Sequence, residues 1–168
     1  MLSFTHSSSS MINVKLPFIS VLLPVYNRRK LVVEAIDSAL AQDHPSFEIV
    51  VSDNCSTDGT WEECITRYGN DPRVVILRNS KNLGPVPNWL AAAKAARGLY
   101  AKFLFSDDLL LPDCLSTLST YLQTEVGFVY SACLIGSSPT NSRSCYSPPA
   151  ASWGNAQRLS SAFGLFLY

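Results

Sequence analysis

Two adjacent carboxylates, Asp107 and Asp108, follow the mostly apolar run at residues 100–106. Such a run is typical of a buried strand, which would deliver both side chains to the edge of a sheet. In open α/β sheets ligands bind beyond the carboxyl ends of the strands, and paired carboxylates there can hold a hard divalent cation that in turn binds phosphate. The plainer interpretation, which the pair alone favours, is that one Asp begins the turn into the next helix and the other is solvated.

Two more strands are expected to end on polar residues. Residues 19–25 form an apolar, β-branched run followed by Tyr26, and residues 47–51 form a second run that leads into an oxygen-rich loop at 52–59. An aromatic ring can stack on a base, and a loop carboxylate such as Asp53 can accept a hydrogen bond from a base or a ribose. Together with a metal-binding carboxylate pair, these groups predict a site for a nucleotide diphosphate at one rim of the sheet.

The elements that must position these groups alternate along the chain. Apolar residues recur at helical spacing in four segments, and short apolar runs separate them. The predicted helices cover residues 28–42, 61–68, 88–97 and 115–122, and the predicted strands cover residues 19–25, 47–51, 74–77, 100–106 and 127–134. This alternation predicts an α/β fold, Rossmann-like, in which helices flank a mainly parallel sheet with right-handed crossovers. The strand order does not follow from the sequence.

Local signals mark the ends of the helices. Asn27 is expected to cap the first helix, and Thr60 and Glu63 have the spacing of a capping box for the second. Asp58 is interpreted as a cap of that second helix rather than as a ligand. Gly98, just past the third helix, is interpreted as backbone punctuation.

The composition indicates one globular domain without a strongly charged surface. The chain has 168 residues, enough for a single core, and 47% of them are hydrophobic while 15% are charged. Thirteen basic and thirteen acidic residues give a formal net charge of zero. This balance lacks the basic surface that binding to a nucleic acid would need, so no nucleic-acid partner is expected.

The cysteines and the N-terminal residues predict a location inside the cell. Five cysteines occur without a C-x-x-C pair, which favours free thiols in a reducing compartment. Residues 1–10 do not resemble a secretory signal, because they lack a basic region and an apolar region. No apolar run approaches the roughly 20 residues needed to span a bilayer. A cytoplasmic protein is expected.

At the residues described above, the chain resembles the family 2 glycosyltransferases of GT-A fold. Four segments carry the resemblance in an ordered series between residues 19 and 134. Residues 19–27 resemble the first strand and turn of the family, residues 50–60 its second acidic loop, residues 82–89 its Asn-x-Gly segment and residues 98–108 its Gly-x-Tyr strand and metal motif. Any one segment would be a weak signal, whereas four in order are a strong one.

The resemblance implies roles for individual residues. Pro24, Val25 and Tyr26 would line the base and the ribose of the donor, and Asp53 would hydrogen-bond the uracil edge. The nucleotide-sugar-binding set implied in this way is Pro24, Val25, Tyr26, Asp53, Asn82, Asn88 and Asp107, and the metal-binding set is Asp108 and Asp107.

The cofactor that the resemblance implies is a divalent metal, Mn²⁺ or Mg²⁺. Asp108 would ligate it between the two phosphates, and Asp107 would face the ribose or the metal shell. The metal would stabilise charge on the leaving nucleoside diphosphate. The family often has another acidic residue before this pair, but Phe105 and Ser106 stand there, which leaves two carboxylates.

The function that the resemblance implies is sugar transfer from a nucleotide-diphosphate sugar, expected to be UDP-linked, to a carbohydrate or lipid-linked acceptor. Inversion at the sugar carbon is expected, and it needs a general base, usually a carboxylate in the second half of the domain. This chain has no Asp or Glu after Glu125. The sequence is therefore expected to be a truncated glycosyltransferase whose fold is incomplete at the C-terminus and whose base lies beyond Tyr168.

Three regions follow from this interpretation. Residues 1–17 are expected to be a loosely attached lead-in, residues 18–135 the nucleotide-sugar-binding GT-A domain, and residues 136–168 a loop and a terminal helix at the start of a missing acceptor region. Peripheral association with a membrane stays open.

Two other hypotheses compete with this interpretation. A protein that only holds a nucleotide sugar, without turnover, is suggested by the carboxylate-free stretch after Glu125. A nucleotidyltransferase would also combine an α/β sheet, a metal and a diphosphate. It is disfavoured because no Gly-rich phosphate loop bearing Lys or Arg follows the first strand.

Overall fold

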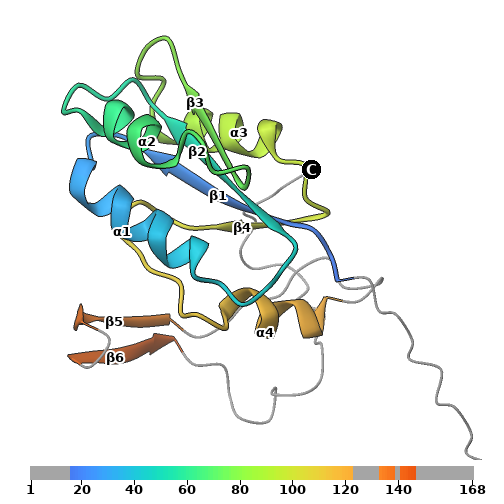
Figure 1. Cartoon of the computed structure of the whole chain (residues 1–168). Coiled ribbons are helices and arrows are strands. Elements are labelled where there is room, and N and C mark those ends of the chain that lie inside the picture. The colour runs from blue at the N-terminus through green and yellow to red at the C-terminus, as the bar shows by residue number, and fades with distance from the viewer. Residues whose placement is uncertain (1–15, 123–132, 139–140, 147–168) are drawn as a thin grey trace, which may run out of the picture.

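Four parallel strands form the central sheet of the protein, whose computed structural model describes residues 16–122, 133–138 and 141–146. They are β1 (Ile19–Val25), β2 (Phe47–Asp53), β3 (Val74–Arg78) and β4 (Tyr100–Phe103), in the order β3-β2-β1-β4 (Figure 1). The predicted mainly parallel sheet is confirmed, and the structure adds the strand order.

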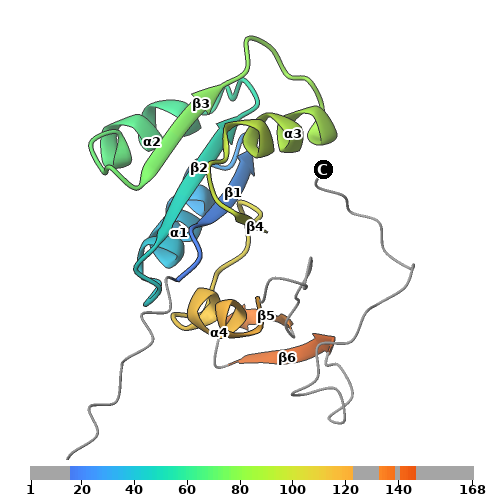
Figure 2. The same ribbon diagram turned by 90° about the vertical axis from the view of Figure 1, so that its right-hand side faces the viewer.

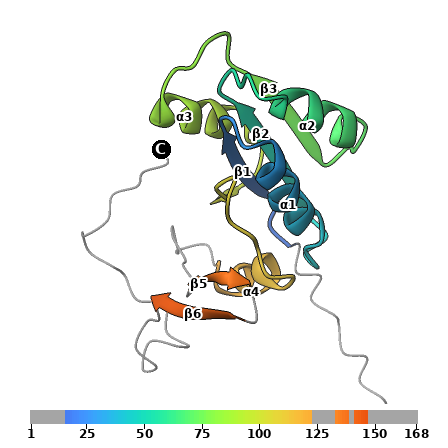
Figure 3. The same ribbon diagram turned by 90° about the vertical axis from the view of Figure 1, so that its left-hand side faces the viewer.

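Helices cover both faces of this sheet. α1 (Arg29–Leu40) and α2 (Thr60–Tyr68) lie on one face and α3 (Pro85–Ala95) on the other, as the two turned views show (Figures 2 and 3). α4 (Cys114–Tyr121) follows β4 along the chain. These helices overlap the four predicted segments. In the described part of the chain, no helix is long and apolar enough to cross a membrane.

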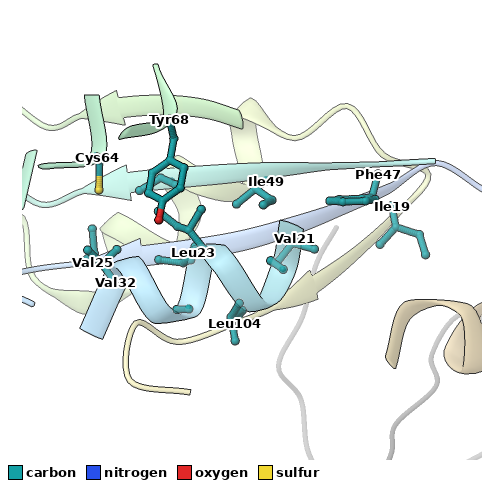
Figure 4. Packing of buried hydrophobic residues seen from close by; sticks show 14 of the residues in the cluster. Ile19, Val21, Leu23, Val25, Val32, Phe47, Ile49, Cys64, Tyr68 and Leu104 are labelled. Carbon is teal, nitrogen blue, oxygen red and sulfur yellow. The ribbon is translucent and has the colours of Figure 1, made fainter. Parts of the chain in front are cut away.

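The larger part of the core lies between the sheet and helices α1 and α2. Val21 and Leu23 of β1 point to this side, where Val32 and Tyr68 pack with them from the two helices (Figure 4). Leu22 points to the opposite side and packs with residues of β2 and α3. Every residue of β1 and β2 is buried. Burial on both faces explains why these strands are apolar at most consecutive positions.

Three of the five cysteines, Cys55, Cys64 and Cys114, are free thiols, as predicted for them. Cys64 lies in the core beside α1, and burial raises its pKa to about 12. A thiol with such a pKa stays protonated near neutral pH, so Cys64 is a core residue and not a nucleophile.

The N-termini of α1 and α2 are built differently from the prediction. Asn27 does not cap α1, because its Oδ1 accepts a hydrogen bond from the loop after β2 (2.8 Å). The predicted capping box is also wrong: Thr60 is the first residue of α2, and Glu63 pairs with Arg29 of α1 (2.8 Å). Asp58 joins the two helices instead, because its carboxylate accepts from the backbone N of Thr60 (3.0 Å) and of Arg29 (3.2 Å). The structural interpretation of Asp58 is confirmed and extends to a second helix.

Beyond α4 the structure corrects a prediction about the C-terminal region. β5 (Cys133–Ser138) and β6 (Asn141–Tyr146) pair antiparallel in a separate two-stranded sheet. The loop predicted at residues 136–154 is therefore wrong for the end of β5 and for β6. Backbone groups make the hydrogen bonds between strands, so the Ser and Asn residues that indicated a loop do not prevent pairing. Residues 127–132 of the predicted fifth strand, the predicted terminal helix and most of the predicted lead-in lie outside the described residues.

A buried histidine in the loop between α1 and β2 is expected to make stability depend on pH. His44 is 1% exposed, its Nδ1 accepts from the backbone N of Ser46 (3.2 Å), and its Nε2 has no partner in the described part of the chain. Burial lowers the pKa of His44, although Asp43 and the Ser46 hydrogen bond oppose this. The unfolded chain, with a histidine pKa near 6.5, therefore takes up the proton first.

The stability contributed by neutral His44 should be complete above the unfolded pKa and should fall as the pH decreases below it. Between pH 7.5 and 5.5 we expect the wild-type chain to lose about 1 kcal/mol of unfolding free energy through this residue. Urea unfolding at both pH values should show a smaller loss for His44→Gln. The variant keeps His6, so the comparison cancels the contribution of that histidine. An equal loss in the two proteins would refute the assignment.

Candidate functional site

The carboxyl ends of β1, β2 and β3 lie level with one another at one edge of the sheet. Val25 pairs with Asp53, and Asp53 pairs with Arg78. The alignment continues past the strands, because the backbone N of Asn54 donates to Val25 O (2.9 Å) and that of Asn79 donates to Asp53 O (2.8 Å). β4 runs parallel beside β1 on its other side. The polar residues that follow these strands therefore share one edge, as predicted.

A pocket of about 230 Å³ opens at this edge. It lies where the end of β1, the loop after β2 and the beginning of α3 meet. Its lining residues are Pro24, Val25, Tyr26, Asn54, Asn82, Gly84, Pro85, Asn88 and Trp89. Five of the seven predicted nucleotide-sugar residues line it, which are Pro24, Val25, Tyr26, Asn82 and Asn88.

Tyr26, which directly follows β1, supplies a partly exposed aromatic ring to the pocket. The residue is 41% exposed, although it follows a strand that is wholly buried. The next residue, Asn27, has a φ of 50°, and its backbone N donates to Ser56 Oγ (2.9 Å). This hydrogen bond joins the loop after β1 to the loop after β2 and holds the turn that contains Tyr26. A ring held in this way can stack on a flat ligand.

Asp53 lies behind the pocket and not on its wall. Its side chain is 1% exposed, and its two carboxylate oxygens accept from the backbone N of Ser56 (3.1 and 3.3 Å). Arg78 forms an ion pair with it through Nε (3.1 Å) and also donates to Ser56 O (2.7 Å). The Asp53 carboxylate thus stabilises the loop after β2 through its bonds to Ser56 and Arg78. The sequence could not reveal this pairing, because Arg78 comes from the neighbouring strand.

Asp107 and Asp108 lie in the turn that follows β4. Both are exposed, and the backbone N of Asp108 donates to Phe105 O (3.0 Å), which closes the turn. Although Asp108 is exposed, the loss of some of the water around its carboxyl raises its pKa, the negative charge of Asp107 raises it further, and Lys102 opposes both. Neither residue lines the pocket. The pair is available to a cation approaching from solvent.

The donor set at this turn fits a hard divalent cation whose remaining ligands come from phosphate and water. Two neighbouring carboxylates repel each other, and a cation would relieve that repulsion. Within residues 16–122, 133–138 and 141–146, no cluster of three or more His, Cys, Asp or Glu side chains could hold a metal ion. Mg²⁺ is commonly bound by one or two carboxylates together with substrate phosphates, so two protein ligands are sufficient.

Four lining residues were not assigned to the site from the sequence. Asn54 follows Asp53 directly, and Gly84 and Pro85 begin α3. Trp89 lies one turn into α3, and its ring contacts those of Phe103 (6.2 Å between centroids) and Phe105 (5.5 Å). The position of Trp89 inside the resembling segment was the available signal. Its contact with the end of β4 required the fold.

Comparison with known proteins identifies the family of this chain. The family model described as Glycosyl transferase family 2 matches residues 20–156. The chain belongs to glycosyl transferase family 2. The match extends beyond residue 135, where the predicted donor-binding domain ended. The GT-A-type α/β fold predicted from the sequence is confirmed by its similarity to solved structures such as that of S. aureus TarS, which is 33% identical with a TM-score of 0.57.

Proteins similar to this family 2 chain include a named sugar transferase and two solved structures with bound nucleotides. The abequosyltransferase RfbV of Salmonella typhimurium is 42% identical over 111 residues, which are 64% of this chain and 33% of that protein. The structure of S. aureus TarS 1–349 in complex with UDP is 27% identical, covers 71% of this chain and 41% of its own, and has a TM-score of 0.58. A Pyrobaculum calidifontis mannosyltransferase in complex with GDP-Man and Mn²⁺ is 27% identical and has a TM-score of 0.54. The match covers 57% of this chain and 29% of the mannosyltransferase chain. This family 2 chain therefore spans less than half the length of these proteins.

Proposed function

We propose that the chain carries the donor site of a glycosyltransferase that uses a nucleotide-diphosphate sugar, UDP-linked by preference. The observation that carries the proposal is the pocket itself. Three separate segments, residues 24–26, 54 and 82–89, meet there at the carboxyl edge of a parallel sheet. Ligands of open α/β sheets bind at this edge. The UDP complex of a related structure supports the nucleotide class.

In this proposal the base lies against Tyr26 and the ribose against Pro24 and Val25. The exposed tyrosine ring supplies a stacking surface, and the rigid strand end supplies a wall. Asp53 holds the loop behind the base through Ser56 and Arg78. A direct bond from Asp53 to a uracil edge, which the resemblance implies, would require one of these partners to move.

The diphosphate would reach from the pocket to the turn after β4. Asp108 would hold Mn²⁺ or Mg²⁺ there, with Asp107 beside it. When bound, such a cation supplies positive charge that stabilises the departing nucleoside diphosphate. The turn that carries the two carboxylates follows β4, and β4 pairs directly with β1, whose end lines the pocket. The acceptor is proposed to be a carbohydrate or a lipid-linked carbohydrate, and the protein is proposed to act in the cytoplasm.

Binding of a nucleotide sugar without transfer is the second candidate. It is favoured by one observation, the lack of any Asp or Glu after Glu125. Transfer with inversion needs a general base near the acceptor, and the residues after Glu125 include no carboxylate that could act as this base. Measurable hydrolysis of UDP-glucose or UDP-N-acetylglucosamine that disappears in Asp108→Ala would contradict this candidate.

Thermal unfolding with UDP and Mn²⁺ tests the donor site and its metal. At UDP concentrations near 100 times Kd we expect stabilisation by about 2.7 kcal/mol. That corresponds to a rise in Tm of roughly 5–10 °C for a chain of this size. Asp108→Ala should abolish the part that depends on Mn²⁺, because it removes a metal ligand.

Asp113→Ala is the matched control for this experiment. Asp113 is also exposed, it precedes α4, and its side chain makes no cap bond. It should keep the full shift in Tm. An equal Mn²⁺-dependent shift in Asp108→Ala and wild type would disprove the metal assignment, and no shift with UDP in the wild type would disprove the donor site.

A further inference from the structure

A chain of five hydrogen-bonded side chains runs from β2 to the pocket wall. Ser52 Oγ donates to Asn88 Oδ1 (2.8 Å), and Asn79 Nδ2 donates to the same Oδ1 (2.9 Å). Asn79 Nδ2 also donates to Asn54 Oδ1 (3.1 Å), and Asn54 Nδ2 donates to Asn82 Oδ1 (2.8 Å). The five residues come from β2, the loop after it, the loop after β3 and α3. This amide chain therefore links the segments that form the pocket.

Backbone groups fix the orientation of three of the four amides in this chain, those of Asn54, Asn82 and Asn88. The backbone N of Leu83 donates to Asn54 Oδ1 (2.9 Å), and that of Gly84 donates to Asn82 Oδ1 (2.9 Å). Asn88 Nδ2 donates to the backbone O of Ser52 (3.0 Å). An N–H can only meet an acceptor and a carbonyl can only meet a donor, so the oxygen and nitrogen of these side chains are assigned by their partners.

With the amides in this orientation, one side-chain nitrogen that lines the pocket, Asn82 Nδ2, has no acceptor among the described residues. Asn54 Nδ2 is used by Asn82 Oδ1 and by the backbone O of Gly84 (3.2 Å), and Asn79 Nδ2 is used by two amide oxygens. Asn82 Nδ2 makes no hydrogen bond to any residue that the structure describes, and Asn82 is exposed and lines the pocket. Asn79 is half-buried and does not line the pocket.

We propose that Asn79 is a positioning residue that acts through Asn54 to hold the amide of Asn82 with its N–H groups toward the pocket. There Asn82 donates to an oxygen of the bound nucleotide. Hydrogen bonds in such chains polarise one another, so the outermost donor is strengthened as well as oriented. The inference rests on the proposed function, because it assumes that the pocket holds the nucleotide.

The affinity of the 168-residue chain for UDP, measured by calorimetry, tests this role. Asn79→Ala removes two donated hydrogen bonds without touching the pocket, and we expect it to weaken UDP binding roughly tenfold, which is about 1.4 kcal/mol. Ser80→Ala is the matched control. It changes an exposed neighbouring residue whose side chain makes no hydrogen bond within the described residues, so it should bind as the wild type does. Far-UV circular dichroism must show each variant folded at the temperature used.

A double-mutant cycle separates positioning from a general structural role. If Asn79 acts through Asn82, Asn79→Ala should change the UDP affinity of Asn82→Ala by less than about twofold. A tenfold loss in both backgrounds would overturn the proposed path, and an unchanged affinity in Asn79→Ala alone would overturn the positioning role. Failure of the wild-type chain to bind UDP would instead refute the proposed function and, with it, this inference.

Discussion

Replacement of Glu48 by Ala is expected to lower the free energy of unfolding by about 3 kcal/mol. Glu48 lies in β2 and is 1% exposed. Its carboxylate accepts from Ser20 Oγ (2.7 Å) and from the backbone N of Arg97 (2.7 Å), and it forms an ion pair with the Arg97 guanidinium (2.6 Å). Alanine would leave these donors unpaired and open a cavity in the sheet. The expected loss lies at the low end for a buried pair because Arg97 is largely exposed.

Urea unfolding at pH 7 measures this effect, with Glu34→Ala as the control. Glu34 is exposed on α1, and its removal should cost less than about 0.5 kcal/mol. Burial raises the pKa of Glu48, but the hydrogen bonds from Ser20 and Arg97 outweigh it, so the pKa is lowered. Its stabilisation is therefore present above the unfolded pKa of about 4.5 and is lost as the pH falls through the lower folded value. Equal urea midpoints for Glu48→Ala and wild type would contradict this account.

Substitution of Gly98 by Ala is expected to cost about 2–3 kcal/mol, because the backbone there has no room for a side chain. A Cβ atom at this position would lie 2.5 Å from Ser20 N, 2.7 Å from Ser20 Oγ and 2.7 Å from Tyr100 O. Two of these three atoms belong to the backbone of β1 and β4, so relief requires the strands to separate. Gly98 N also donates to Ser20 Oγ (2.8 Å), which ties this position to the Glu48 network.

Leu99→Ala is the matched control for Gly98→Ala. Leu99 is the next residue and is 74% exposed, so its truncation should leave the urea midpoint nearly unchanged. Because β4 carries the Asp107–Asp108 turn, we also expect Gly98→Ala to reduce the Mn²⁺-dependent shift in Tm with UDP, which Leu99→Ala should not do. A Gly98→Ala variant as stable as Leu99→Ala would show that β4 does not need this close approach.

The sequence was sufficient for the parallel sheet because its strands are buried on both faces. Runs such as residues 19–25 are apolar at most consecutive positions, and helical spacing is clear between them. The prediction was wrong where two partners compete for the same polar group. Asn27 and Thr60 carry sound capping signals, but the loop after β2 takes the first and Asp58 binds the second. Such choices depend on segments that are distant in the sequence.

The candidate site could be predicted in part, for the same reason. Strand-end residues such as Tyr26 follow directly from the strand pattern, and the structure places Tyr26 on the pocket wall. Asp53 and Asn88 were expected to bind the donor, yet their side chains are buried and already hydrogen-bonded within the protein. Trp89 lines the pocket through its position on α3. A motif gives the residue type, whereas the hydrogen-bond partners decide whether that residue meets the ligand.

Titration of the ¹⁵N-labelled chain with UDP, followed by two-dimensional NMR, tests the central claim most directly. The claim is that one pocket at the carboxyl edge of the sheet holds the nucleotide. We predict that the largest amide shifts occur at Val25, Tyr26, Asn54 and the non-proline residues of segment 82–89, with little change near Glu48 at the amino end of the strands. The absence of shifts, or shifts that are largest around Glu48 and Arg97, would contradict the account.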